Sequence, residues 1–414
     1  MGLHLVHVLA ALVVALAAGW LGRTLARLCR QPSVIGEIVV GLLAGPLVIA
    51  ILGRPAFDLL LPAGVFGTLK TIAEAALVLF LVGVTHEMRL GDIRAVRGAI
   101  AWVFAGAFVL PMLAGAALAA WIVLSGHGTL RGDAPGPAFF VYLMVALAIT
   151  AVPVLARILA DHRTGATAEG RLALSSAMVI DIAGWLVLSV AIALNAGSVT
   201  GFLRAMGVFA GAAVVALVIR RLLATSAAAT LAERSPVGAA VLLGVLAIAI
   251  ALTIERLGLT AIFGAVLTGL AVPVSWGRAV TYVRGAGLAL APVFFVVTGI
   301  GVVATPAAAT GWAVIVLAIL LGTVSKVGGG YLGARLGRQS RPVAARVGVY
   351  VNTRGMTELI VLQAGLKAGL LTGPLFLALV VMAVVTTLAT GPGLALLDKV
   401  LPVQRSRRPT SQPR

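Results

Sequence analysis

Four ionisable residues lie deep inside long apolar stretches of the sequence, where a charged side chain needs a partner or a function. Asp181 lies near the middle of the apolar segment 171–195, and no basic residue stands within one helical turn of it. An isolated charge at the centre of a bilayer costs on the order of 3 kcal/mol on insertion scales. We therefore predict that Asp181 binds a proton and a cation in turn. The alternative is a protonated carboxylic acid with a structural role.

Two buried basic residues accompany this acid. Lys326 lies in ILLGTVSKVGGGYLGARLG, and Arg354 stands four residues before Glu358 in VNTRGMTELIVLQAG, which places that pair on one helix face. Lysine can lose its proton when desolvated, whereas arginine effectively cannot. We expect Lys326 and Arg354 to be supporting charges and Glu358 to belong to the ion-binding site. The alternatives are a Lys326 side chain that extends to the membrane surface and a purely structural Arg354–Glu358 ion pair.

Two further acids, Glu37 and Glu74, lie nearer the ends of apolar segments. A charge near a segment end can reach the interface, where it costs far less than at the bilayer centre. For both we favour packing or interfacial roles.

Two segments have the features of interrupted helices. In ALAITAVPVLARIL, Pro153 lacks an amide donor and disfavours the preceding helical turn, which frees carbonyls near Thr150. In NTRGMTEL, Gly355 loosens the backbone. Non-helical backbone at membrane depth is tolerated only where it is buried in protein or lines a cavity. The pair of interruptions therefore predicts a binding site that includes Thr150.

The elements that position these residues are transmembrane helices. The chain has 414 residues, 61% of them apolar and only 11% charged, against about 25% charged residues in soluble domains. Apolar segments long enough to cross a bilayer predict about thirteen spans. They lie near residues 3–28, 32–52, 68–86, 98–125, 138–160, 171–195, 200–220, 236–254, 258–274, 287–303, 310–334, 346–370 and 374–400.

The predicted fold is therefore an all-α polytopic membrane protein. Six helices on each side of a linker helix, at about 200–220, suggest two repeats, at about 1–195 and 236–400. An offset of seven helices makes equivalent helices run in opposite directions, which gives an inverted repeat. The membrane domain is expected to span residues 1–403, with a short basic tail over 404–414.

The net charge of +18 could indicate a nucleic-acid binder, but its distribution indicates a membrane protein instead. When Lys and Arg are assigned to alternate sides of the predicted spans, most fall on one side. By the positive-inside rule this places the N-terminus outside and the C-terminus in the cytoplasm. We expect a multi-pass protein of the plasma membrane, in contact with the lipid bilayer.

The sequence contains no pattern typical of a cofactor site. Cys29 is the single cysteine, so neither an intramolecular disulfide nor a thiolate metal site is expected. No strand is predicted before GGGYLGARLG, so small residues for close helix packing explain it better than a nucleotide-binding loop. The predicted cytoplasmic loops offer arginines and few acids to bind metal and phosphate, which argues against a membrane enzyme.

Seven segments together resemble the monovalent cation:proton antiporter-2 family. They are PSVIGEIVVGLLAGP, LVLFLVGVTHEM, AITAVPVLARIL, AMVIDIAGWLVLSVAIAL, PVFFVVTGI, SKVGGGYLGARLG and NTRGMTELIVLQAGLKAGLL followed by MAVVTTLATGP. The resemblance implies an inverted-repeat antiporter fold with crossed broken helices, a homodimer, and a core that slides against a dimerisation scaffold. The family's cytosolic nucleotide-binding domain has no counterpart among the 414 residues, so regulation by such a domain is not expected.

The resemblance also implies roles for single residues. By position, Asp181 matches the family's ion-binding aspartate and Lys326 its core lysine. Thr150 and Pro153 fall in the first broken helix, and Arg354 and Glu358 in the second. Many members carry an acid, Asn or Gln immediately before the aspartate, where this chain has Ile180. Lys326 is then left to pair with Asp181, to pair with Glu358, or to stay neutral.

These observations predict an antiporter that exchanges Na⁺ or K⁺ for protons by alternating access. The alternative is an uncoupled channel or uniporter on the same fold. Because Ile180 cannot titrate, one carboxylate stands at the matched site. We therefore expect electroneutral exchange of one cation for one proton.

Overall fold

The computed structural model describes residues 2–29, 31, 33–87, 97–126, 130–162, 164, 165, 167–195, 199–257, 261–303 and 311–401. Every regular element within these residues is helical, which confirms the predicted all-α class. Ten of the described helices are long and apolar enough to cross a membrane. The predicted spans at 138–160, 258–274 and 346–370 contain shorter helices, so the count of thirteen stays a prediction.

The first half of the chain contains the elements α1 (Gly2–Leu28), α2 (Ser33–Leu52), α3 (Arg54–Leu60), α4 (Ala63–Glu87), α5 (Arg97–Leu124), α6 (Gly136–Ala148), α7 (Val152–Asp161), α8 (Ala168–Asn195) and α9 (Val199–Leu223). The second half contains α10 (Ser226–Arg234), α11 (Pro236–Arg256), α12 (Ala261–Ala271), η3 (Val274–Trp276), α13 (Gly277–Val303), α14 (Trp312–Leu336), α15 (Arg341–Val351), α16 (Met356–Lys367), α17 (Gly373–Leu388) and α18 (Thr390–Val400). The short helices α3 and α10 were not predicted.

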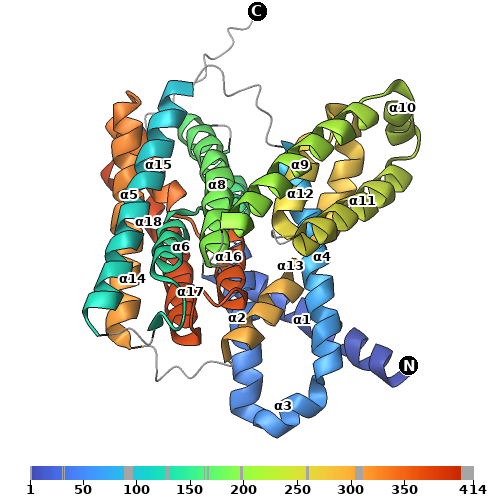
Figure 1. Ribbon diagram of the computed structural model, residues 1–414, viewed down its shortest axis with the longest axis horizontal. Helices are drawn as coiled ribbons and strands as arrows, with labels where there is room; N and C mark the ends of the chain where they lie inside the picture. The colour runs from blue at the N-terminus through green and yellow to red at the C-terminus, as the bar shows by residue number, and fades with distance from the viewer. Residues whose placement is uncertain are drawn as a thin grey trace, which may run out of the picture.

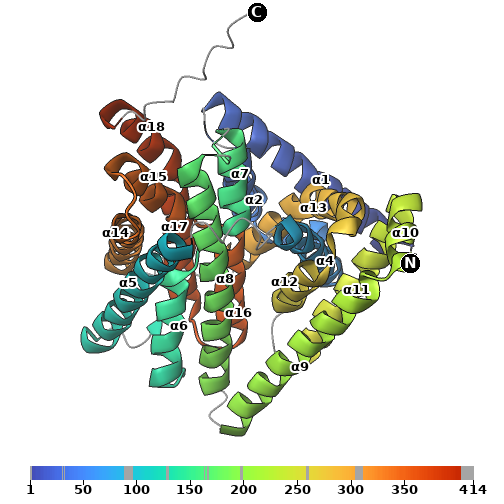
Figure 2. The same cartoon turned by 90° about the horizontal axis from the view of Figure 1, so that it is seen from above.

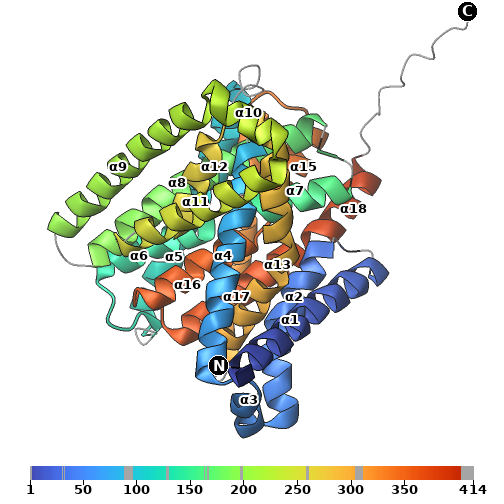
Figure 3. The same ribbon diagram turned by 90° about the vertical axis from the view of Figure 1, so that its right-hand side faces the viewer.

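The helices form two bundles, seen on the left and right of Figure 1 and from above in Figure 2. The broken-helix bundle contains α5 to α8 and α14 to α18, with α14 packed along α5 and α6 packed on α5 and α8. The flanking bundle contains α1, α2, α4 and α11 to α13, with α13 packed along α4 and α2. Helix α9 contacts α8 of the first bundle and α12 of the second, and it lies at the outer edge of the molecule in Figure 3.

Helix pairing follows a two-fold pattern. In the predicted repeats, α2 corresponds to α12 and α4 to α13. In the flanking bundle α2 packs on α13, and in the same way α12 packs on α4. In the broken-helix bundle, α5 packs on α14. Two inverted repeats would produce this pattern, and their boundaries stay a prediction.

Glycines allow the closest helix contact in the broken-helix bundle. A Cβ atom added at Gly106 of α5 would collide with the carbonyl oxygen of Gly329 in α14, and one at Gly333 would collide with that of Trp102. The glycine-rich run of α14 therefore brings two backbones together, because only glycine leaves room for the facing carbonyls.

Candidate functional site

The predicted site residues gather where two interrupted helices meet. Residues 149–151 separate α6 from α7, and residues 352–355 separate α15 from α16. The amide of Ala151 donates to the carbonyl of Thr353 over 3.0 Å, so the two breaks bind each other through backbone atoms. The Thr150 hydroxyl donates to the carbonyl of Val351 over 3.2 Å. These bonds satisfy backbone groups that the interrupted helices leave unpaired in a region without water.

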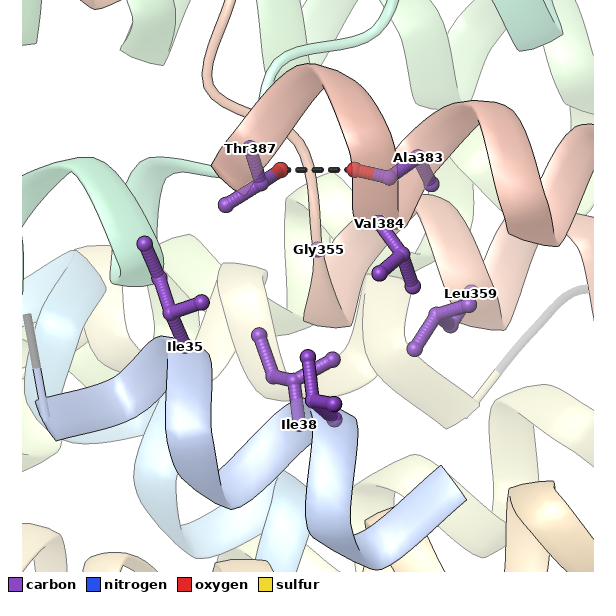
Figure 4. A pocket seen from close by; sticks show the side chains of 8 residues that line it. Ile35, Ile38, Gly355, Leu359, Ala383, Val384 and Thr387 are labelled. Carbon is purple, nitrogen blue, oxygen red and sulfur yellow. Dashed lines mark hydrogen bonds between the residues drawn. The ribbon is translucent and has the colours of Figure 1, made fainter. Parts of the chain in front are cut away.

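Each break has a local cause in the sequence. Pro153 is the second residue of α7, where its missing amide costs nothing because the first turn of a helix has no internal acceptor. Gly355 precedes α16 with φ of 149°, a conformation that favours glycine. A Cβ atom there would lie 2.7 Å from Val154 Cγ2. Figure 4 shows Gly355 between Thr387 of α17 and Ile35 and Ile38 of α2.

Two basic side chains lie at the carboxyl end of α6. Arg354 donates from Nη1 to the carbonyl of Ala146 over 3.1 Å and from Nη2 to that of Leu147 over 2.7 Å. Lys326 donates from Nζ to the carbonyl of Ala148, and also to that of Ala107 in α5 over 3.0 Å. The last carbonyls of a helix lack internal donors and carry partial negative charge. The end of α6 is therefore an acceptor site that binds both basic side chains.

Arg354 and Glu358 form an ion pair of 2.7 Å, and neither side chain is exposed at all. Glu358 lies in the first turn of α16, where the partial positive charge of the helix end favours an acid. Thr387 of α17 joins the pair to the bundle, because its hydroxyl donates to the carbonyl of Arg354 over 2.8 Å and accepts from its amide over 3.0 Å. The predicted ion pair is therefore formed, with Arg354 in the second break and Glu358 in the helical turn that follows it.

Lys326 contacts backbone and not a carboxylate. It is fully buried, so it does not extend to the membrane surface. Among the residues that the structure describes, Lys326 donates to these two carbonyls, and no ion pair joins it to Asp181 or Glu358. Both carboxylates are nevertheless close enough to interact electrostatically with its charge. Lys326 therefore pairs with neither Asp181 nor Glu358 in this arrangement.

Asp181 lies in the middle of α8, beside the first break. Val152, the first residue after this break, and Asp181 line a common cavity. One carboxylate oxygen, Oδ1, is buried without a hydrogen-bond partner in the described part of the chain. Asp181 lines a cavity of about 20 Å³, which it shares with Thr357. A space of that size holds about one water molecule.

Two threonines and a tyrosine of the site were not singled out from the sequence. The Thr357 hydroxyl donates to the carbonyl of Thr150 over 3.4 Å, and the Tyr142 hydroxyl donates to that of Val361 over 2.9 Å. Thr387, described above, is the third. Thr357 and Thr387 lie in segments that carried the family resemblance, but nothing in a single sequence says which threonines face a helix break.

The remaining predicted features lie away from this crossing. Glu37, near the start of α2, forms an ion pair of 2.8 Å with Arg23 of α1. Glu74 lines a larger cavity between the two bundles. The predicted tail, 404–414, lies outside the described residues. Within those residues, no group of three His, Cys, Asp or Glu side chains could bind a metal ion.

Comparison with known proteins identifies the family of the chain. Residues 10–398 match the family described as "Sodium/hydrogen exchanger, transmembrane". Cation/H(+) antiporter 19 of Arabidopsis thaliana is 32% identical over 384 residues, which cover 89% of this chain and 47% of the plant protein. The Na(+)/H(+) antiporter NhaS4 of Synechocystis sp. is 28% identical over 386 residues, which cover 90% of this chain and 92% of that protein.

Among solved structures, the sodium proton antiporter MjNhaP1 from Methanocaldococcus jannaschii has the same fold. The two structures superpose with a TM-score of 0.68 at 14% sequence identity, over 96% of this chain and 97% of that one. The chain spans about half the length of the plant relatives that it matches.

Proposed function

Because the chain belongs to the sodium/hydrogen exchanger family, we propose that it exchanges a monovalent cation, Na⁺ or K⁺, for protons across a membrane. One observation carries the proposal: the buried Asp181 oxygen without a hydrogen-bond partner among the described residues, beside a cavity of about 20 Å³. Such an oxygen gains a partner from either a proton or a cation. Only one of the two fits at a time, and competition for a single carboxylate couples their movements.

The surrounding charges support this role. Arg354 neutralises Glu358 through their ion pair, so Glu358 has a partner that Asp181 lacks. Lys326 is held at the end of α6 and offsets the negative charge of Asp181 without contacting it. Val152 of α7 lines the same cavity as Asp181 at the break. In the proposed cycle Asp181 carries a cation from one side of the membrane to the other and returns with a proton. On each side one of the two is released before the other binds, and the proton is held by an O–H bond on the carboxylate.

We extend the proposal to the assembly and its orientation. The family resemblance supports a homodimer, and the distribution of Lys and Arg supports a cytoplasmic C-terminus in the plasma membrane. Large exposed apolar side chains, including Val14 of α1, Leu217 of α9 and Val241 of α11, suit contact with lipid. The membrane domain is proposed to span residues 1–403, with repeats at about 1–195 and 236–400.

Transport by purified protein in liposomes tests the proposal. An outward Na⁺ or K⁺ gradient should drive proton uptake, and a proton gradient should drive cation uptake. Asp181→Asn, which keeps the side-chain shape but cannot bind a proton, should abolish both fluxes. Asp58→Asn is the matched control, because Asp58 is an exposed acid of α3. Cation flux without proton coupling would favour the channel alternative, and full exchange by Asp181→Asn would refute the assignment of Asp181.

A further inference from the structure

A second, larger cavity opens between the two bundles. Its volume is about 510 Å³, and it is lined by both apolar and charged side chains. Lys70 and Glu74 of α4 line it from the flanking bundle, and Ile192 of α8 and Gln363 of α16 line it from the broken-helix bundle. Any movement of one bundle against the other must therefore change its shape.

The larger cavity and the one beside Asp181 follow each other along the same helices. The same four helices, α4, α8, α12 and α16, line both cavities. On α8 the larger cavity reaches Ile192, and the smaller one contains Trp185 and Asp181. On α16 the corresponding residues are Gln363 and Thr357. The larger cavity thus leads toward Asp181 from the end where α8 and α16 terminate.

One partly buried hydrogen bond joins the bundles beside this cavity. Gln363 donates from Nε2 to the Thr298 hydroxyl of α13 over 2.9 Å. The Thr298 hydroxyl donates its own proton to the carbonyl of Phe294 over 2.8 Å, so it is free to accept from Gln363. Thr298 is fully buried, and a polar group that loses its partner in such surroundings is costly.

A second contact between the bundles is weaker. Lys367 of α16 and Glu255 of α11 form an ion pair of 3.3 Å, but the Lys367 side chain is 72% exposed. Exposed pairs contribute little, because water competes for both charges. The hydrogen bond is therefore the stronger determinant of how the bundles sit at this end.

We propose that Gln363 and Thr298 form a latch that holds the bundles in the arrangement where the large cavity leads toward Asp181. This inference rests on the proposed function, because alternating access requires Asp181 to face the opposite end in another arrangement. The latch must then break during each cycle. Neither residue contacts the transported ion; both are positioning residues that bias the two arrangements.

The first test removes the latch without changing shape. Thr298→Val eliminates the acceptor of Gln363. Thr268→Val is the matched control, because the Thr268 hydroxyl of α12 is equally buried in the same bundle and donates to the Gly264 carbonyl of its own helix. Cys29→Ser gives a chain without cysteine, and Ile192→Cys then places one thiol in the cavity for a membrane-impermeant reagent.

Loss of one hydrogen bond should shift the balance between arrangements by roughly twofold to tenfold. We expect Thr298→Val to slow labelling at position 192 by up to that factor, and to raise the apparent cation KM on the cavity side accordingly. Thr268→Val should leave both unchanged. Unchanged labelling in Thr298→Val, or equal slowing in both variants, would overturn the latch.

The second test fixes the bundles covalently. In the cysteine-free chain, Gln363→Cys with Thr298→Cys is bridged by a short bis-methanethiosulfonate reagent, and reduction then reverses the bridge. Bridging should stop exchange and reduction should restore it. The control pair, Val349→Cys with Gly393→Cys, lies within the broken-helix bundle, where these positions are in contact, and its bridging should leave exchange unchanged.

Persistent exchange in the bridged Gln363–Thr298 variant would refute the requirement that the latch opens. The thiol-labelling experiment needs no transport. If the parent protein shows no coupled exchange, the proposed function fails, whereas the labelling rates still report whether the latch controls access to the cavity.

Discussion

We expect the two members of the buried Arg354–Glu358 ion pair to contribute unequally to the free energy of unfolding. Arg354 donates to two carbonyls of α6 in addition to Glu358, whereas Glu358 accepts from Arg354 alone among the residues that the structure describes. Removing Glu358 therefore leaves a cation that still has two acceptors. Removing Arg354 leaves an acid without its partner and frees two buried carbonyls.

The magnitudes follow from these contacts. Breaking a fully buried pair by removing one partner costs about 3–5 kcal/mol, because the remaining charge is uncompensated. We expect Arg354→Gln to lower the free energy of unfolding by about that amount, since neither side chain is exposed. Glu358→Gln should cost less, about 1–3 kcal/mol, which is the usual loss for an incompletely satisfied polar group.

Thermal unfolding of the two variants in detergent, followed by size-exclusion chromatography, measures the difference. The double variant Arg354→Gln with Glu358→Gln completes a double-mutant cycle. Its loss of stability should be smaller than the sum of the two single losses, because the two side chains stabilise each other. Glu255→Gln, which breaks an exposed ion pair, is the control and should change stability by less than about 1 kcal/mol. A Glu358→Gln variant as unstable as Arg354→Gln would refute the reasoning that the end of α6 stabilises Arg354 independently of Glu358.

Two further predictions follow from the site. Exchange of one Na⁺ for one proton at Asp181 moves no net charge, so its rate in voltage-clamped proteoliposomes should not follow an imposed potential. A potential of 100 mV is worth about 2.3 kcal/mol per charge moved, so a steady current would indicate a second proton, with Lys326 as its candidate carrier. Gly355→Ala should destabilise the fold by about 1–3 kcal/mol and reduce exchange, because it meets both an unfavourable φ and the Val154 side chain. Gly369→Ala has a positive φ but open space, so a smaller loss is expected in the same unfolding assay, and an equal loss would contradict the role of close packing.

The sequence by itself determined the class of protein and predicted the residues of a candidate site. Apolar segments long enough to cross a bilayer predict membrane helices from composition alone, because helix length and side-chain hydropathy are local properties. The cost of a buried charge singles out Asp181, Lys326, Arg354 and Glu358 for the same reason. Pro153 and Gly355 mark the two helix interruptions, since each acts on its own backbone.

Only the tertiary structure decided what these residues contact. The sequence left Lys326 to pair with a carboxylate or to stay neutral, whereas the structure places it on the carbonyl end of α6, 178 positions away. Thr387 forms a hydrogen bond with Arg354 in the second break across a sequence separation of 33 residues. Thr298 and Gln363 are separated by 65 residues in the sequence. Helix ends and buried hydroxyls become partners only when packing brings distant segments together, because a backbone carbonyl carries no side-chain identity that a sequence could reveal.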